Sequence, residues 1–286
     1  MSRRVAIATC EDLYVDPDTP LLLEALTSVG LAYELLAWDD PNAQWDRFDA
    51  TVIRSTWDYA PRRDEFLEWA SSVPTLYNSL DLVTWNTDKH YLRSLQLAGI
   101  NVIPSTFADV AIDPIFPAGN FVVKPTVGAG SMDAERYGAG DHARAHAHVR
   151  SLHASGRDVI IQPYVESIDE EGELALVFVD GEFSHAMRKG AMLNAVENDR
   201  SQLFRAEQMS VATASPETLQ FARRVLEAGG ASSALYARVD LCRLDDDWAV
   251  MELELTEPSL FLTYHPEAAA KLADAILKRL ELRLRH

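Results

Sequence analysis

The chain has 286 residues, of which 48% are hydrophobic and 24% are charged, and its formal net charge is −18. Length and composition are those of a globular protein of about two domains, or of one domain with a large insertion. The acidic balance excludes an extended nucleic-acid-binding surface and an anionic-membrane anchor, because both need excess positive charge.

The first ninety residues alternate apolar runs with helical stretches, which predicts a parallel α/β sheet. Expected strands span 5–8, 32–38 and 50–53, and an expected helix spans 21–29. Ligands bind at the carboxyl ends of parallel strands. A polar and aromatic run follows the third strand, and its candidate ligand-binding residues are Arg54, Ser55, Thr56, Trp57 and Asp58. A hydrogen-bonded loop around a buried tryptophan is the equal alternative.

The rest of the chain is richer in strands. An amphipathic helix is expected over 88–99, where it ends in glycine. The remaining expected strands are 121–124, 159–162, 174–179, 183–188, 235–241 and 248–255, and the remaining expected helices are 216–228 and 266–284. Both of these helices have proline at a plausible first position.

Two hairpins set the register of this second part. Asp180-Gly181 predicts a two-residue turn, and counting back from it pairs Glu173 with Arg188. This pairing alone is also what a simple cross-strand ion pair would give.

The second hairpin turns at residues 245–247. A turn centred on Asp246 places Asp240 opposite Glu252 and Arg238 opposite Glu254, all on one face. Three clustered carboxylates repel one another, and a divalent cation such as Mg²⁺ would relieve that repulsion. A solvated acidic sheet face is the alternative.

A small-residue loop follows the expected strand that ends in Lys124. Its sequence, with Gly128, Gly130 and Ser131, leaves backbone N–H groups free to approach a phosphate, and the lysine adds positive charge. The lysine precedes the glycines, so this is not a Walker A motif. A purely structural hairpin tip would look similar.

In this order, the motifs resemble those of the ATP-grasp superfamily, in its glutathione synthetase-like branch. The similarity rests on Lys89, VVKPTVGAGS, IIQPYV, EGELALVFVDGEF, MRKG, ARVDL and MELELTEPSL. It implies an α/β N-terminal domain over 1–88, a central ATP-grasp lobe over 89–165 and a C-terminal lobe with the metal site over 166–286. The two α+β lobes would enclose ATP between them.

The resemblance also implies roles for individual residues. Lys89 and Lys124 would contact the nucleotide phosphates together with the glycine-rich loop. Gln162, Tyr164 and Val165 would lie at the adenine, and Glu173 would hold the ribose. The metal ligands, for one or two Mg²⁺ ions, would be Asp240, Glu252 and Glu254, and the catalytic basic residues would be Arg188 and Arg238. Family members commonly carry asparagine where this chain has Glu254.

Within the branch, the runs RSTWDY, WNTDKHYLRSL and LTEPSLFL are most similar to the small ligases that include the O-ureido-serine cyclo-ligase of cycloserine biosynthesis. The resemblance implies an ATP- and Mg²⁺-dependent ligase that forms a C–N bond through an acyl phosphate, in antibiotic biosynthesis. The substrate would be a small amino-acid derivative that closes on itself. The alternatives are a ligase that joins two molecules and a nucleotide-binding regulator without chemistry.

Other residue patterns add little to this interpretation. Cys10 and Cys242 lie far apart, which fits a reducing compartment and gives no zinc site. His142 and His146 are spaced as a metal pair could be, but a solvated helix is favoured, and Trp85 is a second tryptophan to test for ligand contact. We expect a cytoplasmic enzyme with a small carboxylate and amine substrate and without nucleic-acid or membrane partners; a homo-oligomer stays open.

Overall fold

The N-terminal part is a parallel sheet with helices packed on it, as the sequence predicts. In the computed structural model, which describes residues 3–190 and 209–283, its strands are β1 (Arg4–Thr9), β2 (Ala32–Ala37), β3 (Ala50–Ile53) and β4 (Leu76–Tyr77). They lie in the order β2-β1-β3-β4, and every pairing is parallel. The intervening helices are α1 (Thr19–Ser28), α2 (Arg63–Ser72) and the short 3₁₀ turns at Trp45–Arg47 and Ala60–Arg62.

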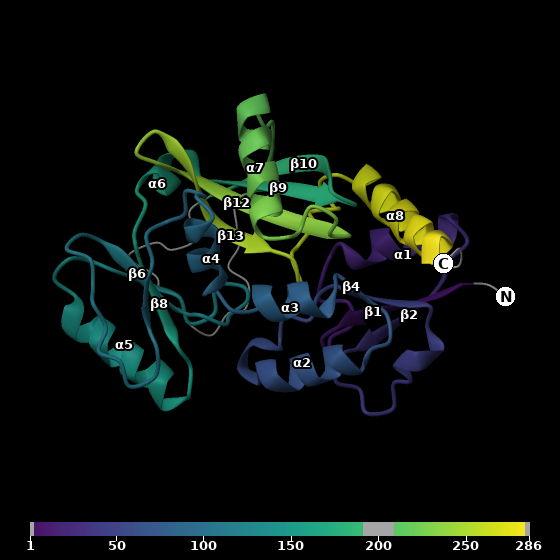
Figure 1. Ribbon diagram of the computed structural model, residues 1–286, viewed down its shortest axis with the longest axis horizontal. Helices are drawn as coiled ribbons and strands as arrows, with labels where there is room; N and C mark the ends of the chain where they lie inside the picture. Colours follow the sequence, from purple (N-terminus) through teal and green to yellow (C-terminus); the bar gives the residue numbers. More distant parts are fainter. Residues whose placement is uncertain (1–2, 191–208, 284–286) are drawn as a thin grey trace.

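The central part is a smaller antiparallel sheet, at the left in Figure 1. Its strands β5 (Thr106–Ala108), β6 (Phe121–Pro125), β7 (Glu135–Tyr137) and β8 (Val159–Pro163) lie in the order β5-β8-β6-β7. Helix α5 (His142–Ala154) covers it and encloses a core of its own around Phe121 and Leu152.

The C-terminal part is a five-stranded antiparallel sheet in the order β11-β10-β9-β12-β13. Its strands are β9 (Glu173–Val179), β10 (Glu182–Lys189), β11 (Met209–Ala212), β12 (Tyr236–Leu244) and β13 (Asp247–Glu254). The accompanying helices are α6 (Ser167–Glu171), α7 (Pro216–Ala228) and α8 (Glu267–Arg283). Ser215 caps α7, whose first residue is proline, as expected. Leu284, the expected last residue of α8, lies outside the described residues.

Helices α3 (Leu80–Asn86) and α4 (Tyr91–Leu97) connect the first part to the second. The expected helix at 88–99 begins later because the Asp88 side chain accepts a hydrogen bond from the His90 N–H at 3.0 Å, in a turn before α4. Leu92 and Leu95 of α4 pack in the core of the C-terminal sheet, beside Leu176 and Val239. The division of the chain into three domains, with boundaries after residues 88 and 165, stays a proposal. In it, α4 belongs to the central domain but packs in the core of the C-terminal sheet.

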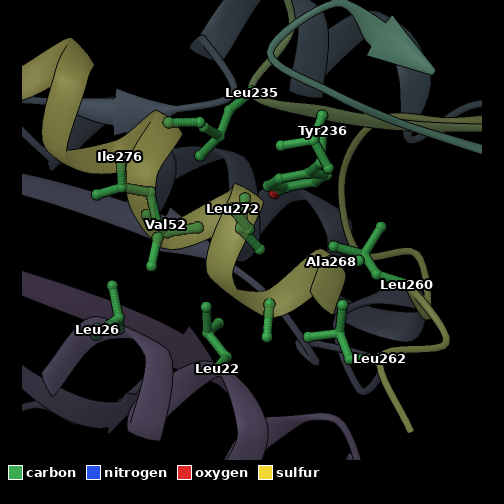
Figure 2. Close-up of a cluster of buried hydrophobic side chains, with 14 of the residues drawn as sticks. Leu22, Leu26, Val52, Leu235, Tyr236, Leu260, Leu262, Ala268, Leu272 and Ile276 are labelled. Carbon is green, nitrogen blue, oxygen red and sulfur yellow. The ribbon is translucent and has the colours of Figure 1, made fainter. Parts of the chain in front are cut away.

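The first and third parts also share a core, which Figure 2 shows. Leu22, Leu26 and Val52 from the N-terminal part contact the same cluster as Tyr236 and Leu272 from the C-terminal part. Apolar side chains far apart in sequence are thereby removed from water in one cluster, which stabilises the two parts as a unit. Among the described residues, no helix is both long enough and apolar enough to cross a membrane.

Candidate functional site

One cavity of about 230 Å³ collects almost every residue expected to bind nucleotide or metal. Its walls come from the central sheet, from the C-terminal sheet, and from Trp57, Tyr59 and residues 86–91 of the preceding part of the chain. The expected residues that line it are Lys89, Lys124, Gly128, Gly130, Ser131, Gln162, Tyr164, Val165, Glu173, Arg238, Asp240, Glu252 and Glu254. Their convergence from six separate segments supports the motif-based prediction that they form one site.

The first hairpin departs from the predicted register by one residue. Val179 pairs with Glu182 across the Asp180-Gly181 turn, as expected, but a β-bulge between Phe183 and His185 shifts the remaining pairs. Glu173 therefore pairs with Lys189 rather than Arg188, so the predicted pairing was wrong. Lys189 is buried and lines the cavity, whereas Arg188 bonds the Glu171 carbonyl and is not among the lining residues.

The second hairpin has the predicted residue pairs. A turn one residue shorter than predicted shifts the register, and a β-bulge shifts it back. Its turn is two residues long, with positive φ at both Asp245 and Asp246, so that Leu244 pairs with Asp247. A bulge next to Asp240 then adds one residue on the opposite strand. As a result, Asp240 lies opposite Glu252 and Arg238 opposite Glu254, which confirms the predicted register.

Buried ion pairs connect the side chains on this sheet face. Arg238 donates two hydrogen bonds of 2.9 Å to the Asp240 carboxylate and also pairs with Glu254. Lys189 Nζ lies 2.7 Å from Asp240 and 2.9 Å from Glu173. Burial alone would raise the pKa of Asp240, but Arg238 and Lys189 lower it. The network thus keeps Asp240 ionised, because each buried charge has a partner.

Lys89 and Lys124 approach Glu252 from the other wall. Lys124 Nζ lies 2.7 Å from the Glu252 carboxylate, and Lys89 Nζ lies 3.9 Å from it and 3.1 Å from the Gly128 carbonyl. Burial acts to raise the pKa of Glu252, but the two lysines hold it well below the usual value. These contacts place two cations beside the glycine-rich loop, where the sequence predicts phosphate binding.

Glu254 lies in a different electrostatic environment. Burial and the neighbouring carboxylates Asp240 and Glu252 raise its pKa to about 7, against the opposing effect of Arg238. Each of the three expected metal ligands is thus paired with a lysine or arginine. Across residues 3–190 and 209–283, no three His, Cys, Asp or Glu side chains are grouped as they would be around a metal ion.

The expected adenine side of the cavity is mainly apolar. Ile103, Val122, Ile168 and Met251 line it together with Gln162 and the segment that follows β8. The Tyr164 N–H donates to the Asn120 carbonyl at 2.8 Å, so this amide is already engaged within the protein.

The run at 54–59 contributes less to the cavity than predicted. Trp57 lines it, and so does Tyr59, the last residue of the run. Arg54, Ser55 and Thr56 are buried and are not among the lining residues; Ser55 Oγ, for example, lies 2.7 Å from Thr9 Oγ1. Asp58 accepts hydrogen bonds from Trp38 and Arg62, outside the cavity. The alternative of a hydrogen-bonded loop with a buried tryptophan describes most of this run.

Two of these residues act on a segment distant in sequence, 255–260. Each of its six consecutive backbone carbonyls accepts a hydrogen bond from a side chain. The distances are 2.7–3.1 Å, and the donors, from residue 255 to residue 260, are Asn78, Tyr236, Trp57, Arg54, Arg238 and His185. This segment, which we call the anchored segment, is therefore fixed by side chains where β13 has ended.

The anchored segment carries Glu257, a cavity residue that sequence reasoning did not single out. Burial and the nearby Glu254 raise the pKa of Glu257 to about 8, although a hydrogen bond from the Tyr59 hydroxyl opposes this. The signal in the sequence was an ionisable residue inside the otherwise apolar and small-residue run LTEPSLFL. Lys189 was missed because the bulge in β10 has no clear sequence signature.

The remaining candidates lie elsewhere. His142 and His146 contact Phe116, which lies in the segment between β5 and β6. Trp85 packs on Tyr91 with ring centroids 5.2 Å apart and is not among the cavity residues. Both cysteines are free and buried. These positions fit packing roles.

Comparisons with known proteins show the family to which the chain belongs. The family model for the N-terminal domain of D-cycloserine synthetase DcsG matches residues 5–80. The cycloserine biosynthesis protein DcsG of Streptomyces lavendulae is 39% identical over 291 residues, covering 94% of this chain and 96% of that protein. The crystal structure of D-cycloserine synthetase DcsG superposes with a TM-score of 0.88 at 37% identity, covering 97% and 99% of the two chains.

A more distant likeness concerns the fold alone. The ATP-grasp ligase PsnB, in a complex with its minimal precursor, Mg and ADP, is 17% identical, covers 97% of each chain and has a TM-score of 0.63. The predicted fold, an α/β domain followed by two ATP-grasp lobes, is confirmed. Because the likeness to DcsG extends over nearly the whole length of both proteins, the chain belongs to the DcsG family of ATP-grasp ligases.

Proposed function

We propose that this ATP-dependent ligase closes O-ureido-serine into a ring by forming a C–N bond within one molecule. The observation that carries the proposal is the cavity in which three lysines and Arg238 face a set of carboxylates, in a member of the DcsG family. In the first step the substrate carboxylate attacks the γ-phosphorus of ATP, which releases ADP and leaves an acyl phosphate. The ureido nitrogen that is bonded to oxygen then attacks the acyl carbon and loses its proton, and inorganic phosphate leaves.

The cationic residues reduce the repulsion of the first step, in which negatively charged oxygens must approach one another. Lys89 and Lys124 would bind nucleotide phosphates beside the glycine-rich loop, since both already hold an anion, Glu252, at that place. Lys189 takes the role first expected of Arg188, because its ammonium group lies in the cavity. Arg238 would stabilise the charge that develops on the acyl oxygen.

The carboxylates Asp240, Glu252 and Glu254 would hold Mg²⁺. They are hard oxygen donors on one sheet face, and each already carries a cationic partner, which supports a preference for positive charge at this position. When bound, the ion would neutralise phosphate charge during transfer. Lys124 and Arg238 are the partners that Glu252 and Glu254 would exchange for it.

The test is an ADP-release assay with O-ureido-serine as the sole organic substrate besides ATP, with mass spectrometry of the products. We expect one ADP per cyclic product and no acceleration when free amino acids are added. Lys124→Met serves as the inactive control. A product that contains two substrate molecules, or an added amine, would replace this proposal with intermolecular ligation. Absence of ADP release over a panel of amino-acid derivatives would support a regulator without chemistry.

A further inference from the structure

The acidic side chains that line the cavity differ in whether they have a cationic partner. Among residues 3–190 and 209–283, five carboxyl groups and four cations line it. Glu173, Asp240, Glu252 and Glu254 each form an ion pair within 4 Å with one of the cations. Glu257 is the exception, because no ion pair to it is found in the described part of the chain. Its partner is a neutral group, the hydroxyl of Tyr59.

The position of Glu257 is fixed by side chains of the run at 54–59. Its backbone carbonyl accepts a hydrogen bond from Trp57 Nε1 at 2.9 Å, and the next carbonyl, that of Pro258, accepts one from Arg54 at 3.1 Å. Tyr59 is held in turn by stacking on Phe66, with ring centroids 4.5 Å apart. The carboxylate is thus presented at a defined place, which is what a recognition residue requires.

We propose that Glu257, with the Tyr59 hydroxyl, forms the subsite that binds the ammonium group of the substrate and so restricts the enzyme to carboxylates that carry a free amine. The inference rests on the proposed function, in which the activated carboxylate belongs to an amino acid. In such a substrate the ammonium nitrogen is bonded to the carbon next to the carboxylate.

The anchored segment explains how both groups can be bound at once. Arg238, the expected partner of the reacting carboxylate, donates to the Ser259 carbonyl at 3.1 Å, two residues after Glu257. Arg238 and Glu257 therefore belong to one rigid unit that places a cation and a carboxyl group on the same cavity wall. An ammonium group bound beside Glu257 would favour the ionised form of that carboxyl group, against the burial that raises its pKa in the free protein. An amino acid offers the complementary pair, a carboxylate for Arg238 and an ammonium group for Glu257.

The test compares O-ureido-serine with its analogue in which hydrogen replaces the amino group. Glu257→Gln keeps the shape and can still bond to Tyr59 but cannot pair with an ammonium ion. We expect it to lower kcat/KM for O-ureido-serine by about 10- to 100-fold, mainly through KM, as expected for loss of a hydrogen bond to a charged group. The value for the analogue should stay within about 2-fold. Tyr59→Phe should act in the same direction with a smaller effect.

Three controls separate this role from a structural one. Glu65→Gln, an exposed position on α2, should leave both substrates unchanged. Glu257→Asp keeps a carboxyl group and should therefore retain part of the preference for O-ureido-serine that Glu257→Gln loses. Calorimetric titration should give unchanged ATP affinity in every variant. Equal losses for both substrates in Glu257→Gln would overturn the proposal. A wild-type enzyme inactive on O-ureido-serine would contradict the proposed function instead, and the amine subsite would then be tested on whichever amino acid releases ADP.

Discussion

At the scale of single residues, two lysines that line the cavity, Lys124 and Lys189, differ in their exposure to solvent and in the number of carboxylates they contact. The Lys124 side chain is 16% exposed and contacts Glu252, whereas the Lys189 side chain is 7% exposed and bridges Asp240 and Glu173. Burial opposes the charged form of Lys189, but the two carboxylates raise its pKa well above the usual value. Lys124 is therefore positioned chiefly for a ligand, and Lys189 also supports the fold.

The two lysines should respond differently to substitution by methionine. Lys189→Met leaves two buried carboxylates without a shared partner, and we expect the free energy of unfolding to fall by about 3–5 kcal/mol. Lys124→Met, at the less buried position, should cost about 1 kcal/mol or less but raise the Kd of ATP at least ~10-fold. Lys89→Ala should weaken ATP binding likewise. Urea unfolding and calorimetric titration measure both quantities, and similar stability losses in both methionine variants would refute the distinction.

Substitutions at Glu254 and Glu252 should differ in their effect on activity. Glu254→Asn keeps an oxygen that can accept from Arg238 and removes a charge that burial disfavours, so we expect activity within ~10-fold of the wild type. Glu252→Gln removes the main partner of Lys124 and should lower kcat at least ~100-fold, equivalent to about 2.7 kcal/mol. Steady-state ADP release measures both variants. Near-total inactivity of Glu254→Asn with normal ATP binding would mean that Glu254 contacts the substrate.

At the scale of the secondary-structure elements, turns and bulges decide which side chains reach the cavity. Side chains alternate along a strand, so one extra residue moves every later one to the opposite face. In β10 a single bulge brings Lys189 in place of Arg188. In the β12–β13 hairpin the bulge compensates for a turn that is shorter than the sequence suggested.

Substitutions in the β12–β13 turn should stabilise the folded protein. Asp245 and Asp246 adopt φ values of 49° and 68°, which suit the Asn-Gly pair of a type I′ turn better than two aspartates. We expect the double substitution Asp245→Asn and Asp246→Gly to raise the free energy of unfolding by about 1 kcal/mol without changing kcat. Asp247→Asn, which removes a charge outside the turn, is the matched control. An equal gain in the control would assign the effect to charge rather than to backbone conformation.

At the scale of the whole molecule, the N-terminal and C-terminal parts form one packed body, while the central sheet has its own core. His185 of β10 contributes to the larger body by its hydrogen bond to the Leu260 carbonyl and by stacking on His265 at 4.3 Å. Burial, helped by His265 and Lys271 and opposed by the Leu260 carbonyl and Glu267, lowers the pKa of His185 to about 4.

This pKa predicts a pH dependence of stability. The unfolded chain, with a histidine pKa near 6.5, binds more protons than the folded one between the two values. The contribution of His185 is thus complete above about pH 6.5 and is lost as the pH falls toward about 4. From about pH 7.5 to about pH 5.5, the wild type should lose about 1 kcal/mol more than His185→Gln. Urea unfolding tests this, with His142→Gln, on the surface of α5, as control; parallel losses in His185→Gln and the wild type would contradict it.

Much of the fold and the site could be predicted from the sequence because local patterns carry them. The alternating apolar runs predicted the parallel sheet, and the ordered motifs predicted the residues around one cavity. Contacts between distant segments were not predictable in this way. Nothing near Trp57 or Arg54 in the sequence indicates that their donors meet carbonyls some 200 residues later, so both were assigned to the substrate rather than to the anchored segment.

The anchored segment sets a limit on how this enzyme can be re-engineered by exchange of parts. Its six carbonyls depend on donors that stand between residues 54 and 238, so the segment is not a modular loop. A graft of residues 255–260 from a relative would bring new side chains but not the donors that hold them. Transplantation therefore requires the segment and its donors as one discontinuous unit, whereas single substitutions at Glu257 leave every anchoring hydrogen bond in place.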